Sequence, residues 1–322
     1  MSEITGTQET AQWEVAAPAR AGSIGRQRRL GVILRLLLAV VAIIFALFPV
    51  VWVISASFNP TGSLATQQLI PANPSLVNYN NLLTNPLSPF GAWLLNSLKV
   101  SIITSVLGLV SIMLSAYSFS RFRFQGRRQL LLGLLLVQVF PTLLMFVAIF
   151  YLFQQLGNYI PALGLNQHAP LILTYLGTQM GIQIWLMKGF FDSIPRDIDE
   201  SALVDGANHW QIFWQLIFPL ARPIVVIVGL LVFIASYNEF VLASVLLKDV
   251  QQYTLMVGLY LFVSDAFTQN WGIFAAGALL GSLPVVIIYL TLQDQIVGGL
   301  TAGAVKGYPE PGTTRPRQEQ GL

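Results

Sequence analysis

Residues 197–223 read DIDESALVDGANHWQIFWQLIFPLARP, and this stretch decides how the chain is organised. It is polar and amphipathic, whereas the segments on both sides of it are strongly apolar. Ile198, Ala202 and Leu203 recur at helical spacing and predict a short helix with a narrow apolar stripe. The sequence therefore predicts a folded polar loop between two hydrophobic spans.

The composition is that of a membrane protein. Charged residues make up 10% of the chain and hydrophobic residues 55%, whereas a typical soluble domain has about 25% charged residues. The chain has no cysteine, which excludes disulfides, thiolate nucleophiles and cysteine metal sites. A soluble enzyme with one hydrophobic core is therefore not expected.

Several apolar segments are long enough to cross a bilayer, which takes about 20 residues. They lie at 30–54, 92–118, 129–153, 169–188, 223–247 and 272–296. Backbone groups in lipid must be hydrogen-bonded within the segment, so these spans are predicted to be helical. We expect an all-α polytopic membrane protein with about six transmembrane helices.

Lysine and arginine concentrate on one side of these spans. The residues on that side are Arg20, Arg26, Arg28, Arg29, Arg35, Arg121, Arg123, Arg127, Arg128, Lys188, Arg196, Arg222, Lys306, Arg315 and Arg317. By the positive-inside rule, both termini and residues 197–223 lie in the cytoplasm. The basic residues therefore report membrane orientation and do not indicate nucleic-acid binding. The same topology separates His168 from His209, so no metal site is predicted.

The chain is expected to have three parts. Residues 1–29 form a disordered cytoplasmic tail, and residues 30–298 form a transmembrane domain that includes a cytoplasmic loop at 189–222. Residues 299–322 form a cytoplasmic tail. On the outer side we expect an ordered, non-helical, proline-rich loop at 55–91 and a second loop at 248–271.

The polar loop carries helix start and stop signals. Asp197 or Asp199 is suited to cap a helix N-terminus, where acidic residues favour the helix dipole. Gly206 is placed to end that helix in a left-handed conformation. Asn208 is suited to cap a second short helix. Ala202 is small enough to let another surface approach closely.

Periodicity alone leaves two interpretations of this loop open. The pair of helices would also fit in the headgroup layer of the membrane, where Trp210 and Trp214 would be favourable. In either case Pro219 and Pro223 are expected to bend the chain into the next span.

The spacing within the loop resembles the EAA loop of bacterial ABC importer permeases. Glu200, Ala202, Gly206 and Pro219 match that pattern at the expected spacing. The departures, at Ser201, Leu216 and Phe218, are conservative. The run Asp205-Gly206-Ala207 is similar to the form in sugar-importer members.

Other motifs narrow the resemblance to the shorter permease of maltose-type carbohydrate importers. They begin at Asn96, Ala116, Phe140, Tyr237 and Gly299, reading NSL, AYSFSRFRF, FP, YNEF and GLTAGAVKG. The resemblance extends from about residue 30 to residue 307. It implies the type I importer permease fold and location in the bacterial plasma (inner) membrane.

The resemblance also implies partners and residue roles. The partners would be a second homologous permease, two cytoplasmic ATP-binding subunits and an extracellular or periplasmic solute-binding protein. The residues expected to contact the ATPase in the loop are Glu200, Ser201, Ala202, Asp205, Gly206, Ala207 and Pro219. A second ATPase contact is expected at Thr301, Gly303 and Lys306. The solute would be a sugar or oligosaccharide.

The chain lacks the P-loop pattern Gly-x-x-x-x-Gly-Lys-Ser/Thr. We therefore expect a non-catalytic subunit without a cofactor, driven by ATP hydrolysis in a partner chain. Two alternatives remain: a permease for another polar solute, or an ion-coupled secondary transporter. The second would need internal repeats and ionisable residues at mid-membrane, for which Glu239 is the single candidate.

Asn238 and Glu239 lie within the fifth predicted span. Polar residues at this depth usually face a cavity or a partner. They are candidates for the translocation path. The alternative is a buried hydrogen bond that fixes helix packing.

Overall fold

The computed structural model describes residues 22–63, 68–139, 141–264 and 269–304. Helices and connecting segments make up these residues, with no strand among them, which confirms the prediction of an all-α membrane protein. The chain divides into two units, residues 1–52 and 53–322. The predicted disordered cytoplasmic tail at 1–29 lies largely outside the described residues, which begin at residue 22.

The first unit contains most of helix α1, Gly22–Phe58. This helix begins earlier than the predicted boundary at residue 30. Large apolar side chains between Val32 and Val51 are exposed along it. From Gly31 to Phe58 this helix is long and apolar enough to cross a membrane, and an apolar helix of this kind is suited to lipid.

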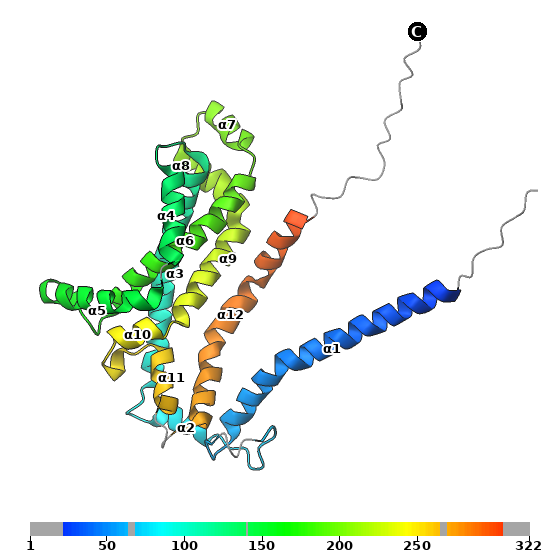
Figure 1. Cartoon of the computed structure of the whole chain (residues 1–322), viewed down its shortest axis with the longest axis vertical. Coiled ribbons are helices and arrows are strands. Elements are labelled where there is room, and N and C mark those ends of the chain that lie inside the picture. The colour runs from blue at the N-terminus through cyan, green and yellow to red at the C-terminus, as the bar shows by residue number, and fades with distance from the viewer. Residues whose placement is uncertain (1–21, 64–67, 140, 265–268, 305–322) are drawn as a thin grey trace, which may run out of the picture. The chain divides into compact units, whose positions relative to one another are not determined.

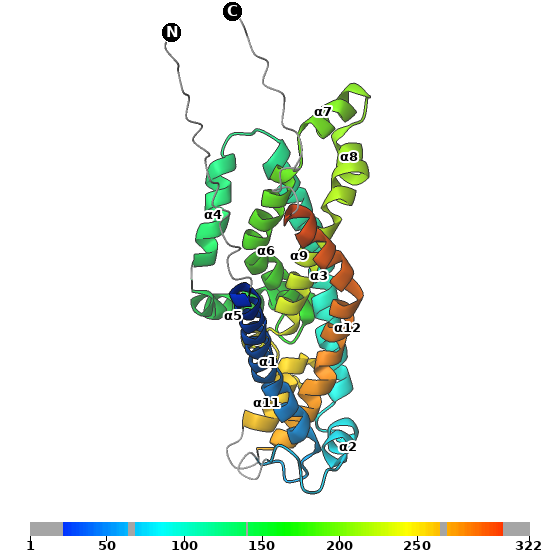
Figure 2. The ribbon, with the colours of Figure 1, turned by 90° about the vertical axis from the view of Figure 1, so that its right-hand side faces the viewer.

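The second unit is built around the long helices α3 (Phe90–Arg121), α6 (His168–Ser193), α9 (Phe218–Tyr237) and α12 (Trp271–Ala304). Helix α3 packs against α6 and α9, and α12 packs against α9 (Figure 1). The short helices α7 (Asp197–Val204) and α8 (His209–Ile212) lie at one end of this bundle. At the opposite end are α2 (Val77–Thr84) and α11 (Leu255–Ser264), as both views show (Figure 2).

The membrane spans only partly follow the predicted six. In the described residues, 4 single helices are long and apolar enough to cross a membrane. The third predicted span is instead a pair of helices, α4 (Arg127–Val139) and α5 (Thr142–Tyr159), bent by 100° at the break before Leu144. The fourth predicted span is the 26-residue helix α6, which is less apolar because it contains Gly177, Gln179 and Gln183.

The fifth predicted span, 223–247, is not one helix. Helix α9 begins earlier, at Phe218, and ends at Tyr237, and a separate helix α10 covers Val241–Leu246. The outer segments also contain helices that we did not expect, α2 within 55–91 and α11 within 248–271. Asn78 on α2 is buried, and its Nδ2 donates to the carbonyl oxygens of Ser57 (3.0 Å) and Asn59 (2.8 Å). These bonds attach α2 to residues 57 and 59, and the prolines of this outer segment lie outside the helix.

Candidate functional site

The polar loop forms the two short helices that its sequence predicts. Acidic residues occupy the first turn of α7, at Asp197, Asp199 and Glu200, where they favour the helix dipole. The predicted aspartate cap is wrong, because the residue before the helix is Arg196 and no side chain caps the helix there.

Gly206 ends α7 in a left-handed conformation, with φ at +86°. The Ala207 N–H donates to the Ala202 carbonyl (2.9 Å), and the Gly206 N–H donates to the Leu203 carbonyl (3.1 Å). These two bonds are those of a Schellman motif, as the glycine predicted. A Cβ at position 206 would meet nothing within 4 Å, so the backbone angle alone favours glycine there.

Asn208 then starts α8 with a reciprocal cap. Its Oδ1 accepts from the Gln211 N–H (2.9 Å), while Gln211 Oε1 accepts from the Asn208 N–H (2.8 Å). This capping box confirms the cap expected at Asn208. The turn between α7 and α8 is therefore fixed at both ends.

The two faces of α7 have different surroundings. Ala202 is 8% exposed and lies in the chain's own hydrophobic core, with Ala207 packed against the same cluster. Its small side chain thus lets α7 approach its own bundle, whereas we expected it to leave room for another surface. The opposite face exposes Glu200, Ser201 and Val204, the last 87% exposed.

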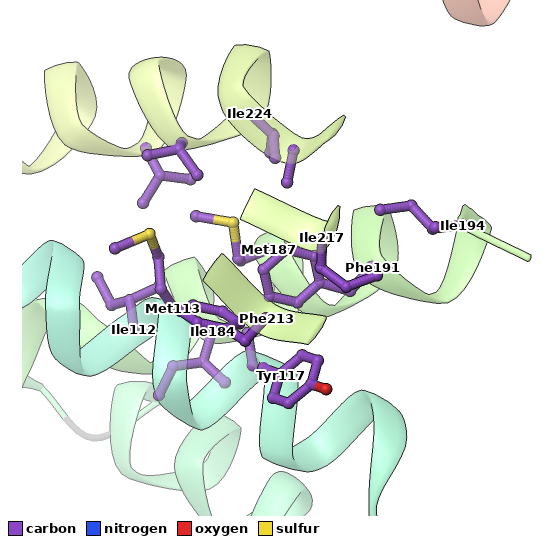
Figure 3. Close-up of a cluster of buried hydrophobic side chains, with 14 of the residues drawn as sticks. Ile112, Met113, Tyr117, Ile184, Met187, Phe191, Ile194, Phe213, Ile217 and Ile224 are labelled. Atoms are coloured by element: carbon purple, nitrogen blue, oxygen red, sulfur yellow. The ribbon is translucent and has the colours of Figure 1, made fainter. Parts of the chain in front are cut away.

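The core beneath α7 joins several helices (Figure 3). Tyr117 of α3 lies between Phe213 and Phe191, with ring centroids 5.0 Å and 6.4 Å away. Met187 and Ile217 are fully buried in the same cluster. A displacement of α7 and α8 would therefore also displace α3, α6 and α9, because close-packed interiors transmit strain.

A polar contact also ties α7 to α3. Arg121, the last residue of α3, places Nη2 3.1 Å from Asp199 Oδ2, and the two side chains are 7% and 14% exposed. The same guanidinium donates to the Ile194 carbonyl (3.2 Å). The sequence indicates Arg121 as an orientation charge and as part of the AYSFSRFRF run, and neither predicts this contact. The sequence shows an acidic residue in the first turn of α7. Its spacing from Arg121 does not predict that the two residues form an ion pair.

The end of α6 joins this contact through Ser120. Ser120 Oγ donates to Asp192 Oδ1 (2.7 Å), and Asp192 also pairs with Lys188. Arg196 Nη2 donates to the Ser120 carbonyl (2.9 Å). We name Ser120, Arg121, Asp192, Arg196 and Asp199 the polar junction.

The two prolines expected to bend the chain, Pro219 and Pro223, both lie inside α9. Residues 209–237 run as one helical segment, in which Phe213–Ile217 forms a π-helical stretch. The Phe218 N–H donates to the Phe213 carbonyl, and the exposed Pro219 follows directly. Pro219, which lacks an N–H, is thus accommodated within the first turn of α9 and next to a widened helical turn.

Asn238 and Glu239 lie beyond the end of α9 and not within a continuous span. Glu239 accepts from the Leu242 N–H (2.7 Å), the Ala243 N–H (3.0 Å) and the Tyr175 hydroxyl (2.7 Å). Asn238 is exposed and lines a cavity of about 490 Å³ with Tyr260 and Trp271. The two residues, which the sequence assigned to one site, therefore have different environments: Asn238 faces a cavity and Glu239 is hydrogen-bonded within the bundle.

The predicted C-terminal contact lies only partly within the described residues. Thr301 and Gly303 are in the last turn of α12, which extends to Ala304, so the predicted tail begins as a helix. Lys306 is outside the described residues. The end of α12 is directed toward the end of the bundle that carries α7 (Figure 1).

Comparison with known proteins identifies related chains. The family model for the inner membrane component of binding-protein-dependent transport systems matches residues 108–300. The maltose/maltodextrin transport system permease protein MalG of Vibrio vulnificus (strain YJ016) is 43% identical over 274 residues, which are 81% of this chain and 91% of MalG. The galactooligosaccharides transport system permease protein GanQ of Bacillus subtilis (strain 168) is 42% identical over 273 residues, 84% of this chain and 94% of GanQ.

The fold is also similar to solved structures. A chain of a bacterial ABC transporter involved in the import of the acidic polysaccharide alginate matches with a TM-score of 0.68 at 25% identity. The match covers 84% of this chain and 97% of that one. A second structure, the alginate transporter in complex with an alginate pentasaccharide-bound periplasmic protein, has the same fold, with a TM-score of 0.61 at 17% identity.

Proposed function

The chain belongs to the family of inner membrane components of binding-protein-dependent transport systems, and we propose that it is the shorter permease subunit of an ATP-driven sugar importer. Its relatives MalG and GanQ are named as permeases for maltodextrins and galactooligosaccharides. The solute class that this supports is a sugar or oligosaccharide. The two termini and α7 would lie in the cytoplasm, in keeping with the distribution of basic residues.

The observation that carries the proposal is the two-sided character of α7. One face is joined to the bundle through Ala202 and Asp199, and the other presents Glu200, Leu203 and Val204 to the outside. Leu203 is 44% exposed and Val204 is 87% exposed, which is costly for a helix that contacts only water. An ATPase subunit with an apolar groove would cover this face.

Coupling would follow from rigidity. The capped turn from Gly206 to Asn208 and the polar junction give α7 few ways to move alone. When the ATPase subunits close on ATP, α7 would carry their motion into α3, α6 and α9 through the shared core. The permease pair would then change from inward-facing to outward-facing.

In this proposal, ATP hydrolysis, the second half of the pore and solute capture are the functions of other chains. The sequence has no P-loop, so ATP hydrolysis takes place in a separate ATP-binding subunit. A second permease would complete the pore. A solute-binding protein on the outer side would deliver sugar to the end of the bundle with α2 and α11.

The test is recovery of the ATPase with affinity-tagged chain from its native membrane. The wild-type chain recovers an ATP-hydrolysing subunit, and Val204→Asp or Glu200→Lys recovers at least tenfold less. Val77→Asp on α2, 37% exposed at the opposite end, is the matched control and recovers the wild-type amount. Wild-type chain isolated as a transport-competent homo-oligomer without an ATPase would refute the proposal.

A further inference from the structure

A cavity with basic walls lies where α4 begins beside α6. Its volume is about 680 Å³, and its lining includes Arg127, Arg128, Lys188 and Trp185. It lies apart from the exposed face of α7. Apart from their contribution to membrane orientation, Arg127 and Arg128 have no role assigned above.

The cavity carries an excess of positive charge. In the described part of the chain, Arg127 and Arg128 form no ion pair, while Lys188 is paired with Asp192. Asp192 therefore offsets one of the three cations and leaves two. The first turn of α4 has no acidic residue, so the positive end of its helix dipole adds to this charge.

The walls of the cavity change from basic to apolar within one turn of α4. Leu131 and Leu132 also line it, and α4 continues with exposed leucines, Leu132 at 51% and Leu136 at 75%. Trp185 also lines the cavity, and its indole N–H donates to the Leu131 carbonyl (3.1 Å). Tryptophan is enriched where membrane headgroups meet acyl chains.

We propose that this cavity binds the headgroup of an anionic phospholipid, with the acyl chains lying along α4. The guanidinium groups of Arg127 and Arg128 have the charge and the hydrogen-bond donors that a phosphate group requires. Basic pockets between transmembrane helices are suited to such headgroups. A soluble phosphate compound shares that chemistry. It does not explain the exposed leucines that continue from the cavity, which favours the lipid.

The test measures lipid binding by the full-length purified chain, using native mass spectrometry in a neutral detergent. Phosphatidylglycerol is compared with phosphatidylcholine of identical acyl chains, and glycerol phosphate is the water-soluble competitor. Each basic residue near a membrane surface contributes about fivefold in affinity, so Arg127→Gln with Arg128→Gln weakens phosphatidylglycerol binding about 25-fold. The double variant with Arg127→Lys and Arg128→Lys binds within about threefold of wild type, since the charge is kept.

Arg123→Gln with Arg222→Gln is the matched control. It removes the same charge from exposed positions that do not line the cavity, and it leaves phosphatidylglycerol binding unchanged. The site is refuted if this control weakens binding as much as the cavity variant, because the attraction would then be diffuse. It is also refuted if wild type binds phosphatidylcholine equally well, a comparison that needs no variant. Displacement of the lipid by equimolar glycerol phosphate would show that the cavity binds a soluble anion and would refute the proposal of a lipid site.

Discussion

Arg121 and Asp199 form an ion pair across the junction of α3 and α7, with Nη2 and Oδ2 3.1 Å apart. The two residues are far apart in the sequence, and both side chains are largely removed from solvent. The pair therefore joins the last turn of a bundle helix to the first turn of the helix proposed to contact the ATPase. In the proposed assembly this pair would be a polar link between the docked ATPase and the membrane helices.

Removing one partner of this pair is expected to destabilise the protein more than removing both. A charge left unpaired in a buried site costs about 3–5 kcal/mol, whereas two apolar residues of similar size can replace the pair at little cost. Arg121→Met and Asp199→Leu alone should each lower the thermal unfolding midpoint in detergent. The double variant should recover most of that loss.

The same variants separate stability from coupling. If the pair links α7 to α3, the double variant is stable but couples ATP hydrolysis to transport less tightly, measured as sugar taken up per ATP hydrolysed in vesicles. Losses in unfolding midpoint that simply add in the double variant would contradict a direct interaction between the two residues.

Gly206 should tolerate substitutions in an order set by its backbone angle. The φ of +86° disfavours side chains by about 1 kcal/mol or more, and asparagine accepts this region better than alanine or valine. Because nothing lies within 4 Å of a Cβ there, side-chain size adds no clash. ATPase recovery should fall in the order Gly, Asn, Ala, Val, with membrane insertion unchanged. Full coupling in Gly206→Val would refute the coupling role of this turn.

Two local features of the loop, the turn at Gly206 and the cap at Asn208, could be predicted from the sequence, whereas the start of α7, which has no aspartate cap, and the long-range contacts could not. Gly206 and Asn208 act through backbone groups within a few residues, so their types and spacing were sufficient to predict a left-handed turn and a helix cap. The partner of Asp199 depends on how α3 and α7 meet in space. Ala202 was misjudged for the same reason, since its burial against the bundle is a tertiary property.

The errors in the spans also have physical causes. Hydropathy over 223–247 is continuous, but Asn238 and Glu239 end α9, and Glu239 accepts from two N–H groups at the start of α10. The pattern over 129–153 likewise spans Pro141, which lacks the N–H that a continuous helix needs. Apolar composition predicts which segments lie in the membrane. It does not predict where a helix ends, which depends on a few local hydrogen bonds.

Two truncations should separate the last turn of α12 from the residues that follow it. Deleting 299–322 removes the helical residues Thr301 and Gly303 and should weaken ATP-driven transport, because we expect this segment to reach the ATPase pair. Deleting 309–322 alone should leave transport unchanged. Both deletions are measured as sugar uptake at matched expression. Equal uptake by the two truncated chains would remove the proposed role.

Single cysteines at 238 and 239 should report different environments in this cysteine-free chain. Asn238 is exposed beside a cavity, and its side chain makes no hydrogen bond within the described residues. Asn238→Cys should therefore react with a water-soluble thiol reagent in one transport state and not in the other. Glu239→Cys should react at least tenfold more slowly, because its side chain is turned toward Tyr175 and the start of α10.

Substitutions that keep or remove the bonds of Glu239 complete this test. Glu239→Gln retains an acceptor for the backbone of α10 and should keep most expression and transport, whereas Glu239→Ala leaves buried donors unpaired at a cost of about 1–3 kcal/mol. Glu239→Ala should thus lower the thermal unfolding midpoint together with transport. Tyr175→Phe, which removes one of the three bonds, should fall between the two variants. A Glu239→Ala chain with wild-type stability and an altered solute preference would contradict this packing role and support the prediction that Glu239 lines the translocation path.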